Sequence, residues 1–505
     1  MSSQSAVRRH LVIGVLAVLA LALFGRLTLR HVGESYFLAD QVDQLQKFEA
    51  LLRFDPEGLW GPVMSGTTAH ALGPFGAFLF GLPVALGFGI DAVHVFTSLL
   101  LVAATAIVFW QLARLDAGLA WAWLIVFTSM RMIWWSAAMF WVNTLLLPLG
   151  LALLALFAAS LGRPSMAKLA GMTLVVMCAL QQHLIAVVGL PVLAIAAVRF
   201  WRSGSRPADH GRHAFRRTAL TLGAVVGIGL LPYAIAEGRT QFRNTRAMFS
   251  HVDAAAHSSS AAGRQAALDS LVLATDPAAV FAAPRTAILA GAAITLAGLI
   301  LVSFRRRLAT DPAAQDQYAA LRWLLVATVV GIAGQAVFYL LMARPLNGLH
   351  YAMLLAPWYP IPAAVLVAAL LPGRDSVAAT MVSGALGFVA IGLLVARAPT
   401  LADRFAERTP WNYRAIVTAL DSLCASESVD TIEGPGLVDE LTPSYDSVLR
   451  YVMKRGYSRC RYVPGSAVLI VANRSGTFDD SIEFNGRTFA RERVLDPGIA
   501  RYGGR

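Results

Sequence analysis

The chain has 505 residues, of which 57% are hydrophobic and only 14% are charged, and its formal net charge is +12. Soluble domains carry about 25% charged residues, so this composition excludes an ordinary soluble protein. The positive charge is mostly arginine, in short segments between long apolar runs. This is typical of membrane-topology signals, and we expect no nucleic-acid partner.

The apolar runs recur up to about residue 396 and predict an all-α polytopic membrane domain over residues 1–396. We expect about eleven transmembrane helices, over residues 10–30, 91–113, 117–136, 140–161, 166–182, 184–201, 218–236, 285–304, 322–344, 351–371 and 375–396. The first run follows Arg8 and Arg9 and lacks a small-residue cleavage site, so an uncleaved span is favoured over a signal peptide.

Residues 31–72 follow the first span and form the most acidic piece of the membrane part. Written on a helix, one face carries Asp40, Asp43, Gln44 and Lys47. The opposite face carries Leu38, Val42, Leu45, Phe48 and Leu52. This pattern predicts a helix that lies on the membrane surface with its carboxylates toward water.

Residues 71–90 are apolar but are broken by two glycines and two prolines. We interpret them as a re-entrant or juxtamembrane piece, so that 31–90 form an outer juxtamembrane loop. Counting 71–90 as a full span would place the arginine-rich loop 199–217 outside, against the positive-inside rule. The prediction is therefore a cytoplasmic N-terminus and an extracytoplasmic C-terminus.

Residues 237–284 form a second long outer loop, which we expect to be flexible; such loops are often lids or binding loops. Arg243 and Arg246 can share one face of a helix there and would suit an anionic headgroup or a pyrophosphate. Ordinary solvated charge is the alternative. Between two spans, an outer tip carries Trp134, Trp135 and Trp141, which we interpret as interfacial anchors.

Residues 397–505 have the composition of a small extracytoplasmic α/β domain. We expect helices over 409–423, behind a threonine cap, and over 444–457. A strand over 466–473 and a hairpin that turns at Asn485-Gly486 follow. Cys424 and Cys460 lie in this tail and could form a disulfide if the tail is outside the cytoplasm, whereas Cys178 falls inside an apolar span and is a packing residue.

Three stretches carry a resemblance to a known family: GESYFLADQ after the first span, ALGPFGAFLFGLPVALGFGIDAVHVFTSLLLVAATAIVFWQLARL, and NGLHYAMLLAPWYPIPAAVL late in the chain. Their layout resembles the GT-C superfamily of polyprenyl-phosphate-sugar-dependent glycosyltransferases. The resemblance is to the branch with protein O-mannosyltransferases and lipid A aminoarabinose transferases. It covers much of the membrane part and implies a GT-C fold and a lipid-linked sugar donor.

The resemblance also implies a catalytic base. The first outer loop of this family usually places an aspartate, often within Asp-Asp or Asp-Glu, as the base. The nearest match is Asp40, which is followed by Gln41 instead of an acid. Asp43 and Glu34 are the alternatives.

The chemistry of such a site can be stated from the residues. A carboxylate takes the proton of an acceptor hydroxyl as it attacks the anomeric carbon, and cations stabilise the departing lipid phosphate. Candidates for the phosphate are Arg243, Arg246, Arg344, His350 and Tyr351. Candidates for other substrate contacts are His183, Asn143 and His70. The sequence establishes no cofactor, although a divalent cation bridging carboxylate and phosphate would fit.

Together these features predict a multi-pass glycosyltransferase of the bacterial cytoplasmic (inner) membrane. It would transfer a sugar, with inversion, from a polyprenyl-phosphate donor to a lipid, glycan or protein at the outer face. A transporter or lipid-linked-sugar flippase is the alternative from another class; it should show mid-span charges and internal repeats, which the chain does not show clearly. A non-catalytic envelope-assembly protein is a further alternative.

Overall fold

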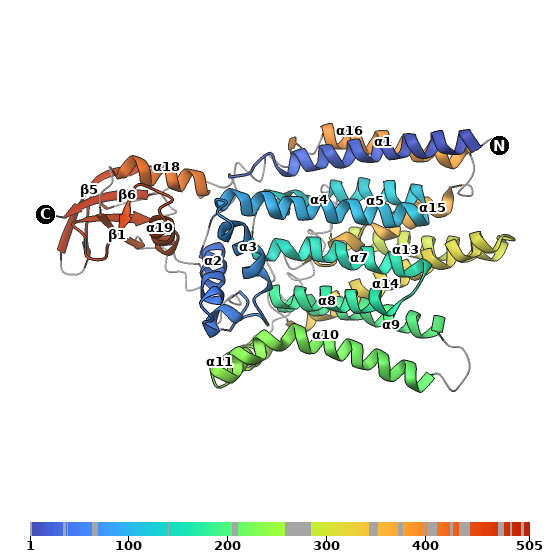
Figure 1. Ribbon diagram of the computed structural model, residues 1–505. Coiled ribbons are helices and arrows are strands. Elements are labelled where there is room, and N and C mark those ends of the chain that lie inside the picture. The colour runs from blue at the N-terminus through green and yellow to red at the C-terminus, as the bar shows by residue number, and fades with distance from the viewer. Residues whose placement is uncertain are drawn as a thin grey trace.

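The computed structural model describes residues 3–33, 37, 39–62, 69–139, 141–204, 211–257, 284–342, 352–371, 377–396, 399–400, 412–424, 428–433, 445–472, 479–484, 487–495 and 499–504. These residues form a bundle of long helices with a small strand-containing domain at one end (Figure 1). The N-terminus lies at the opposite end of the bundle from this domain.

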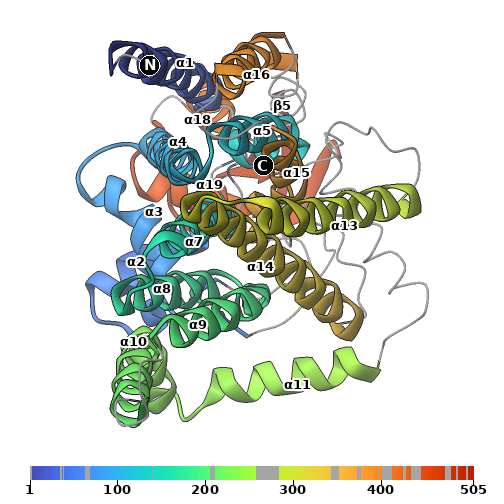
Figure 2. The same ribbon diagram turned by 90° about the vertical axis from the view of Figure 1, so that its right-hand side faces the viewer.

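The bundle consists of helices whose apolar side chains pack on one another. They are α1 (Ser3–Thr28), α4 (Ile90–Leu115), α5 (Ala117–Ser129), α6 (Arg131–Ala138), α7 (Leu146–Gly162), α8 (Met166–Gln182), α9 (Leu190–Gly204), α10 (Gly211–Arg239), α13 (Pro284–Leu308), α14 (Pro312–Met342), α15 (Ile361–Leu370) and α16 (Val377–Ala396). Figure 2, which looks along the bundle, shows α1 and α16 at one edge and α10 and α11 (Arg243–His257) at the opposite edge.

The spans expected from hydropathy are found. Among the described residues, seven helices are long and apolar enough to cross a membrane, or eight if the bent pair α5–α6 is one span. The remaining expected spans correspond to shorter apolar helices in α1, in α8 and over Ala356–Leu370, which includes the short helix η6 (Ala356–Trp358). Residues 71–90 form only the short helix α3 (Phe75–Ala85), as predicted for a juxtamembrane piece.

One expected span is not straight. The helix predicted over 117–136 breaks at Met130, where α5 and α6 meet at an angle of 65°. Trp134 is fully buried after this bend, and its indole Nε1 donates a hydrogen bond to the carbonyl of Thr128 at 2.7 Å. Its interpretation as an interfacial anchor was therefore wrong, because the bend turns this side chain into the helical core.

Helix α2 (Ala39–Leu52) lies across the end of the bundle, between the spans and the strand-containing domain (Figure 1). Its apolar face was predicted to lie on the membrane, but Val42, Leu45 and Phe48 are buried inside the protein, and Leu52 is 61% exposed. Its polar face does not point to open water, because Gln44 and Lys47 are buried as well. The turn η1 (Pro56–Leu59) packs on α2, and Gly61 and His70 contact the ammonium of Lys47 on this face.

Helix α3 packs directly on α2 through Gly81. A Cβ atom at Gly81 would overlap the ring of Phe48. The absence of a side chain is what allows the two helices to approach so closely, and the contact sets the position of α2.

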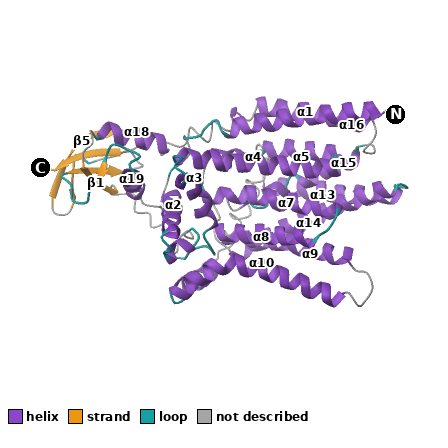
Figure 3. Cartoon of the chain, viewed as in Figure 1, coloured by secondary structure: helices purple, strands orange, loops and turns teal. Residues whose placement is uncertain are grey.

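The C-terminal domain is a mixed sheet flanked by α18 (Tyr413–Leu423) and α19 (Tyr445–Lys454) (Figure 3). Its strands are β1 (Ser428–Glu433), β2 (Arg461–Tyr462), β3 (Val468–Ala472), β4 (Ser481–Phe484), β5 (Arg487–Leu495) and β6 (Ile499–Gly504). Their order in the sheet is β2-β1-β3-β6-β5-β4; β1 is parallel to β2 and β3, and the other pairs are antiparallel.

The predicted strand 466–473 corresponds to β3, and the predicted hairpin to the antiparallel pair β4–β5. The sequence did not indicate β1, β2 or β6. The cap of α18 also differs, because Asn412 accepts the N–H of Ala415 at 2.8 Å and the helix begins at Tyr413. The threonine expected as the cap lies outside the described residues.

A shared apolar core joins the C-terminal domain to the membrane part. Phe37, Leu45 and Phe80 belong to the same buried cluster as residues of α18 and α19. At the edge of this cluster, Arg455 forms an ion pair with Glu49 of α2. Helix α19 is thus fixed against α2.

A disulfide joins Cys424, at the end of α18, to Cys460, just before β2. The pair closes a loop with a sequence separation of 36 residues. A cross-link over such a loop stabilises a domain by about 2–4 kcal/mol. We expect Cys424→Ser to lower the temperature at which protease digests the C-terminal domain, because its unfolded state is no longer restrained.

The measurement is pulse proteolysis on heating, with and without reductant. Cys178→Ser is the matched control, since Cys178 is a free thiol in α8. Reductant should destabilise the native protein and the control alike and leave Cys424→Ser unchanged. Equal sensitivity of all three proteins to reductant would contradict the prediction.

Candidate functional site

A charged cavity of about 700 Å³ lies where α2, η1 and α11 of the membrane part meet α19 of the C-terminal domain. Its acidic lining residues are Asp43, Glu49, Asp55 and Glu57. Its basic lining residues are Lys47, Arg53, Arg243, Arg450, Lys454 and Arg455. Gln46, Ala50, Trp60, His70 and Tyr451 complete the lining. This is large enough for the polar part of a substrate.

Asp43, Lys47 and His70 form one side of the charged cavity, its floor, and the ammonium of Lys47 contacts the other two residues. This ammonium donates to Asp43 Oδ2 at 2.8 Å and to the carbonyl of Gly61 at 2.6 Å, and lies 3.0 Å from His70 Nδ1. An ammonium has three protons, so these three acceptors use all of them. Burial lowers the pKa of Lys47, and the neighbouring carboxylate of Asp43 opposes that effect.

Burial and the nearby ammonium lower the pKa of His70 to about 4, so the ring is neutral, and its Nδ1 lies 3.0 Å from the Lys47 ammonium and 3.3 Å from the carbonyl oxygen of Gly61. The imidazole stacks on the indole of Trp60, with ring centroids 4.9 Å apart. The guanidinium of Arg243 lies 5.1 Å from the centroid of the same indole, a cation–π contact. These contacts place a cation beside the cavity floor.

Arg243 is the first residue of α11, and two contacts of the first turn of this helix hold Arg243 beside the cavity. Glu237, at the end of α10, accepts the N–H of Thr245 at 2.9 Å. The side chain of Asn244 bonds both the N–H of His70, at 2.6 Å, and the carbonyl of His70, at 3.0 Å. Asn244 is almost fully buried, so it joins α11 rigidly to the cavity floor.

Asp40 lies one helical turn before Asp43, in the first turn of α2. Its Oδ2 accepts the indole N–H of Trp141 at 2.9 Å. No residue in the described part of the chain forms a hydrogen bond with the other carboxylate oxygen, Oδ1. Desolvation raises the pKa of Asp40, the bond from Trp141 lowers it, and the charge of Asp43 raises it. This carboxyl group is suited to accept a proton.

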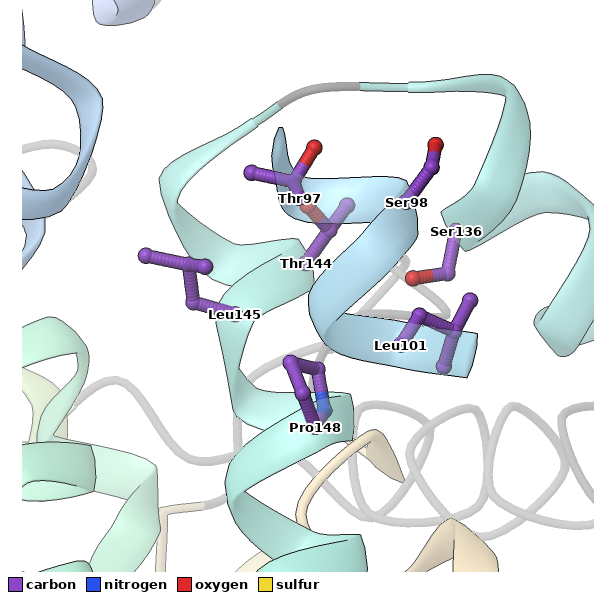
Figure 4. A pocket seen from close by; sticks show the side chains of 7 residues that line it. All are labelled: Thr97, Ser98, Leu101, Ser136, Thr144, Leu145 and Pro148. Atoms are coloured by element: carbon purple, nitrogen blue, oxygen red, sulfur yellow. The ribbon is translucent and has the colours of Figure 1, made fainter. Parts of the chain in front are cut away.

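A second, much smaller polar niche lies deeper, between α4, α6 and the start of α7 (Figure 4). It is lined by the hydroxyls of Thr97, Ser98, Ser136 and Thr144, with a volume of about 10 Å³. That volume accommodates about one water molecule and excludes a sugar or a phosphate. The charged cavity is therefore the candidate site.

The cavity brings together three of the residues that the sequence singled out, which are Asp43, His70 and Arg243. Four others are described but do not line it, namely Asp40, Arg246, Asn143 and His183. Arg246 is exposed on α11. The last four, Glu34, Arg344, His350 and Tyr351, lie outside the described residues.

Asn143 and His183 have local roles in the structure. Asn143 is buried in the turn η2 (Val142–Leu145), and its Oδ1 has no partner among the described residues. His183 Nδ1 accepts the N–H of Ile185 at 3.2 Å and so caps the short helix η3 (Leu184–Gly189). Burial lowers the pKa of His183 to about 4, so the ring is neutral.

Sequence reasoning missed the wall of the cavity that α19 provides. Arg450 and Lys454 are four residues apart and share one face of this helix, which was a readable signal. Trp60 and Asn244 gave no such signal, because their roles depend on contacts with segments far away in the chain. No group of three or more His, Cys, Asp or Glu side chains in the described part of the chain could hold a metal ion.

No protein-family model matches the sequence, and no curated protein is similar to it. Among solved structures, the chain is similar to ArnT, the aminoarabinose transferase from Cupriavidus metallidurans, in a crystal structure bound to undecaprenyl phosphate. The TM-score is 0.56 and the identity 13%, over 99% of this chain and 98% of that chain.

An oligosaccharyltransferase from Archaeoglobus fulgidus, in the apo form, is also similar, with a TM-score of 0.37 and 12% identity. The match covers 82% of this chain and 58% of that chain, and is too distant to bear on the argument. The match to ArnT extends over nearly the whole of both chains, including the C-terminal domain. The chain therefore has the GT-C fold that the sequence resemblance implied.

Proposed function

We propose that this chain is a membrane glycosyltransferase that takes a sugar from a polyprenyl-phosphate donor at the charged cavity. The fold supports the proposal, since ArnT, which shares it, is an aminoarabinose transferase solved with undecaprenyl phosphate. The observation that carries it is the cavity itself. There a fixed cation, Arg243, and the carboxylates of α2 lie together at one end of the bundle.

The proposed location is the outer face of a bacterial cytoplasmic membrane, with the N-terminus inside. Arg305, Arg306 and Arg307 end α13 at the end of the bundle that holds the N-terminus (Figure 1). The cavity lies at the other end, beside the C-terminal domain. The positive-inside rule supports this orientation, and so does the disulfide, because such bonds persist in oxidising compartments.

Arg243 would bind the donor phosphate. Its only ion pair among the described residues is with Glu57 at 3.8 Å, and both side chains are mostly exposed. Such pairs contribute little, so the guanidinium is available to a ligand. Its planar fork matches two phosphate oxygens, and the stacking on Trp60 fixes its position.

Asp40 does not itself line the cavity, but it lies one helical turn before the lining residue Asp43, and we propose it as the general base in a single displacement. The acceptor oxygen forms a bond to the anomeric carbon while the bond from that carbon to the phosphate oxygen breaks. The hydroxyl proton passes to the free oxygen of Asp40, the lipid phosphate leaves with the electron pair, and the sugar configuration inverts. Asp43 is less suited to be the base, because its carboxylate is already paired with the ammonium of Lys47 at 2.8 Å.

The acceptor, a lipid, glycan or protein, would approach along the wall made by α19. Residues 397–505 would then form a domain that completes a site built on residues 1–396. Its cations Arg450 and Lys454 face the same cavity as Arg243. The ion pair of Arg455 with Glu49 holds this wall in place.

The first test is sugar transfer by purified protein in liposomes. Labelled polyprenyl-phosphate sugars are supplied with an extract of host membranes and envelope as acceptor. Asp40→Asn should reduce transfer by roughly a hundred- to ten-thousand-fold, because the amide cannot take up the proton. Asp480→Asn, in the distant hairpin, is the matched control and should leave transfer unchanged.

Transfer at the native rate by Asp40→Asn would move the base elsewhere. If no donor supports transfer by the native protein, and labelled headgroups instead cross the bilayer, the chain is a flippase and the proposal fails.

A second test uses the hydrogen bond between Trp141 and Asp40. Trp141→Phe keeps an aromatic ring but removes the N–H donor that lowers the pKa of Asp40. The pKa of Asp40 should rise further, and a base works only above its pKa. We therefore expect the acidic limb of the pH–rate profile to move to higher pH, with activity at high pH largely retained. An unshifted limb would show that another group titrates.

A third test addresses the phosphate. Arg243→Gln should raise the KM for the donor about tenfold to a hundredfold, the usual effect of losing a charge-assisted hydrogen bond. Arg461→Gln is the control, since Arg461 is exposed on β2 and does not line the cavity. An unchanged KM in Arg243→Gln would remove this residue from the donor site.

A further inference from the structure

Two phenylalanines that are next in the chain to lining residues of the charged cavity have an unusual backbone. Phe54 follows α2 with φ 58°, and Phe242 precedes α11 with φ 60°. In the turn after α2, Asp55 N–H bonds the carbonyl of Ala50 and Phe54 N–H bonds that of Leu51. Glycine is the ordinary residue at such a left-handed helix end, because a side chain is strained there.

Neither ring packs inside the protein, so no buried contact of the ring offsets the backbone strain. The exposed fraction is 86% for Phe54 and 59% for Phe242. The two turns are neighbours, since Arg239 at the end of α10 donates to the carbonyl of Phe54 at 3.4 Å. The helix segment Thr218–Arg239 is long and apolar enough to cross a membrane, so we infer that both rings lie near the level where it would leave the bilayer.

Polar cavity residues flank both rings in the chain. Arg53 and Asp55, on either side of Phe54, line the charged cavity, and so does Arg243, directly after Phe242. An apolar edge at bilayer level thus borders a cavity with a phosphate-binding cation. A molecule that fits both parts has an anionic head and a hydrocarbon tail.

The geometry points to an exit for the isoprenoid chain of the lipid phosphate over Phe54 and Phe242. The phosphate lies at Arg243, and the first isoprene units lie against the two rings on their way to the bilayer. This inference rests on the proposed function for the choice of donor. The inference also identifies the side of the bundle from which the donor enters. This side lies between the end of α2 and the turn that joins α10 to α11.

The test is equilibrium binding to purified protein in detergent, with Phe54→Gly and Phe242→Gly as variants. Glycine removes each ring and also relieves the backbone strain, so these variants should fold. The probes are undecaprenyl phosphate and dimethylallyl phosphate, which carries the same phosphate on one isoprene unit. Phe249→Ala is the matched control, because this ring is 71% exposed but lies farther along α11.

We expect each glycine variant to bind undecaprenyl phosphate about tenfold more weakly, the effect of losing part of one aromatic contact. Binding of dimethylallyl phosphate, and both affinities of Phe249→Ala, should stay close to native. Undiminished binding of undecaprenyl phosphate by both glycine variants would overturn the inference. So would equal competition by phosphatidylglycerol, because the rings would then contact bilayer lipid in general.

A photoreactive undecaprenyl phosphate, with the diazirine on an early isoprene unit, gives an independent readout in the native protein. Cross-links should map to residues 53–54 and 240–242. Cross-links confined to the opposite edge of the bundle, at α1 and α16, would refute the exit (Figure 2). Neither measurement needs sugar transfer, so a failed transfer assay and a failed exit are separate results.

Discussion

The arrangement of the site depends on one buried ammonium group. Lys47 is 6% exposed, and its three bonds reach α2 itself, the loop after η1, and His70. Burying an ion costs several kcal/mol unless its partners compensate. The three acceptors must therefore stay in place together. His70 is joined to α11 through Asn244, so the position of Arg243 depends on the same ammonium.

The ion pair between Lys47 and Asp43 gives the two aspartates at the start of α2 different surroundings. Asp43 faces the Lys47 ammonium at 2.8 Å, which stabilises its charge. Asp40 instead accepts the N–H of the neutral indole of Trp141, and desolvation by burial raises its pKa. Two carboxyl groups one turn apart thus have different environments, which is the usual way in which a protein divides acid–base roles. The proposal that Asp40 is the base rests on this difference.

Hydropathy was sufficient for much of the fold, because a bilayer imposes helix length and apolar composition on every span. Residues 71–90 are also apolar, and it was their glycines and prolines and the positive-inside rule that excluded them as a span. Hydropathy failed at Met130, since a bend leaves no mark on average hydropathy. It failed again at Lys47, because burial of a polar face requires partners from other segments. Gly61 and His70 are 14 and 23 residues away along the chain.

The candidate site was predictable only in part for the same reason. Asp43 and Arg243 were found as charged residues on helical faces, each within one segment. The α19 wall could not be assigned, because nothing local shows that a helix some four hundred residues after α2 packs on it. That contact is created by the shared apolar core and by Glu49, which meets both Arg455 and Tyr451.

The cavity consequently has two walls of different character. The membrane wall carries the proposed phosphate cation Arg243 together with Asp43, and the buried network around Lys47 holds it rigidly. The α19 wall presents Arg450 and Lys454 from a separate domain, with Lys454 about 5.0 Å from the ring centroid of Tyr462. Within the described part of the chain, the bonds of Lys47 run to Asp43, Gly61 and His70, whereas α19 meets α2 through Glu49. The two walls are thus held by different contacts, so under the proposed function the acceptor wall could differ while the phosphate cation stays in place.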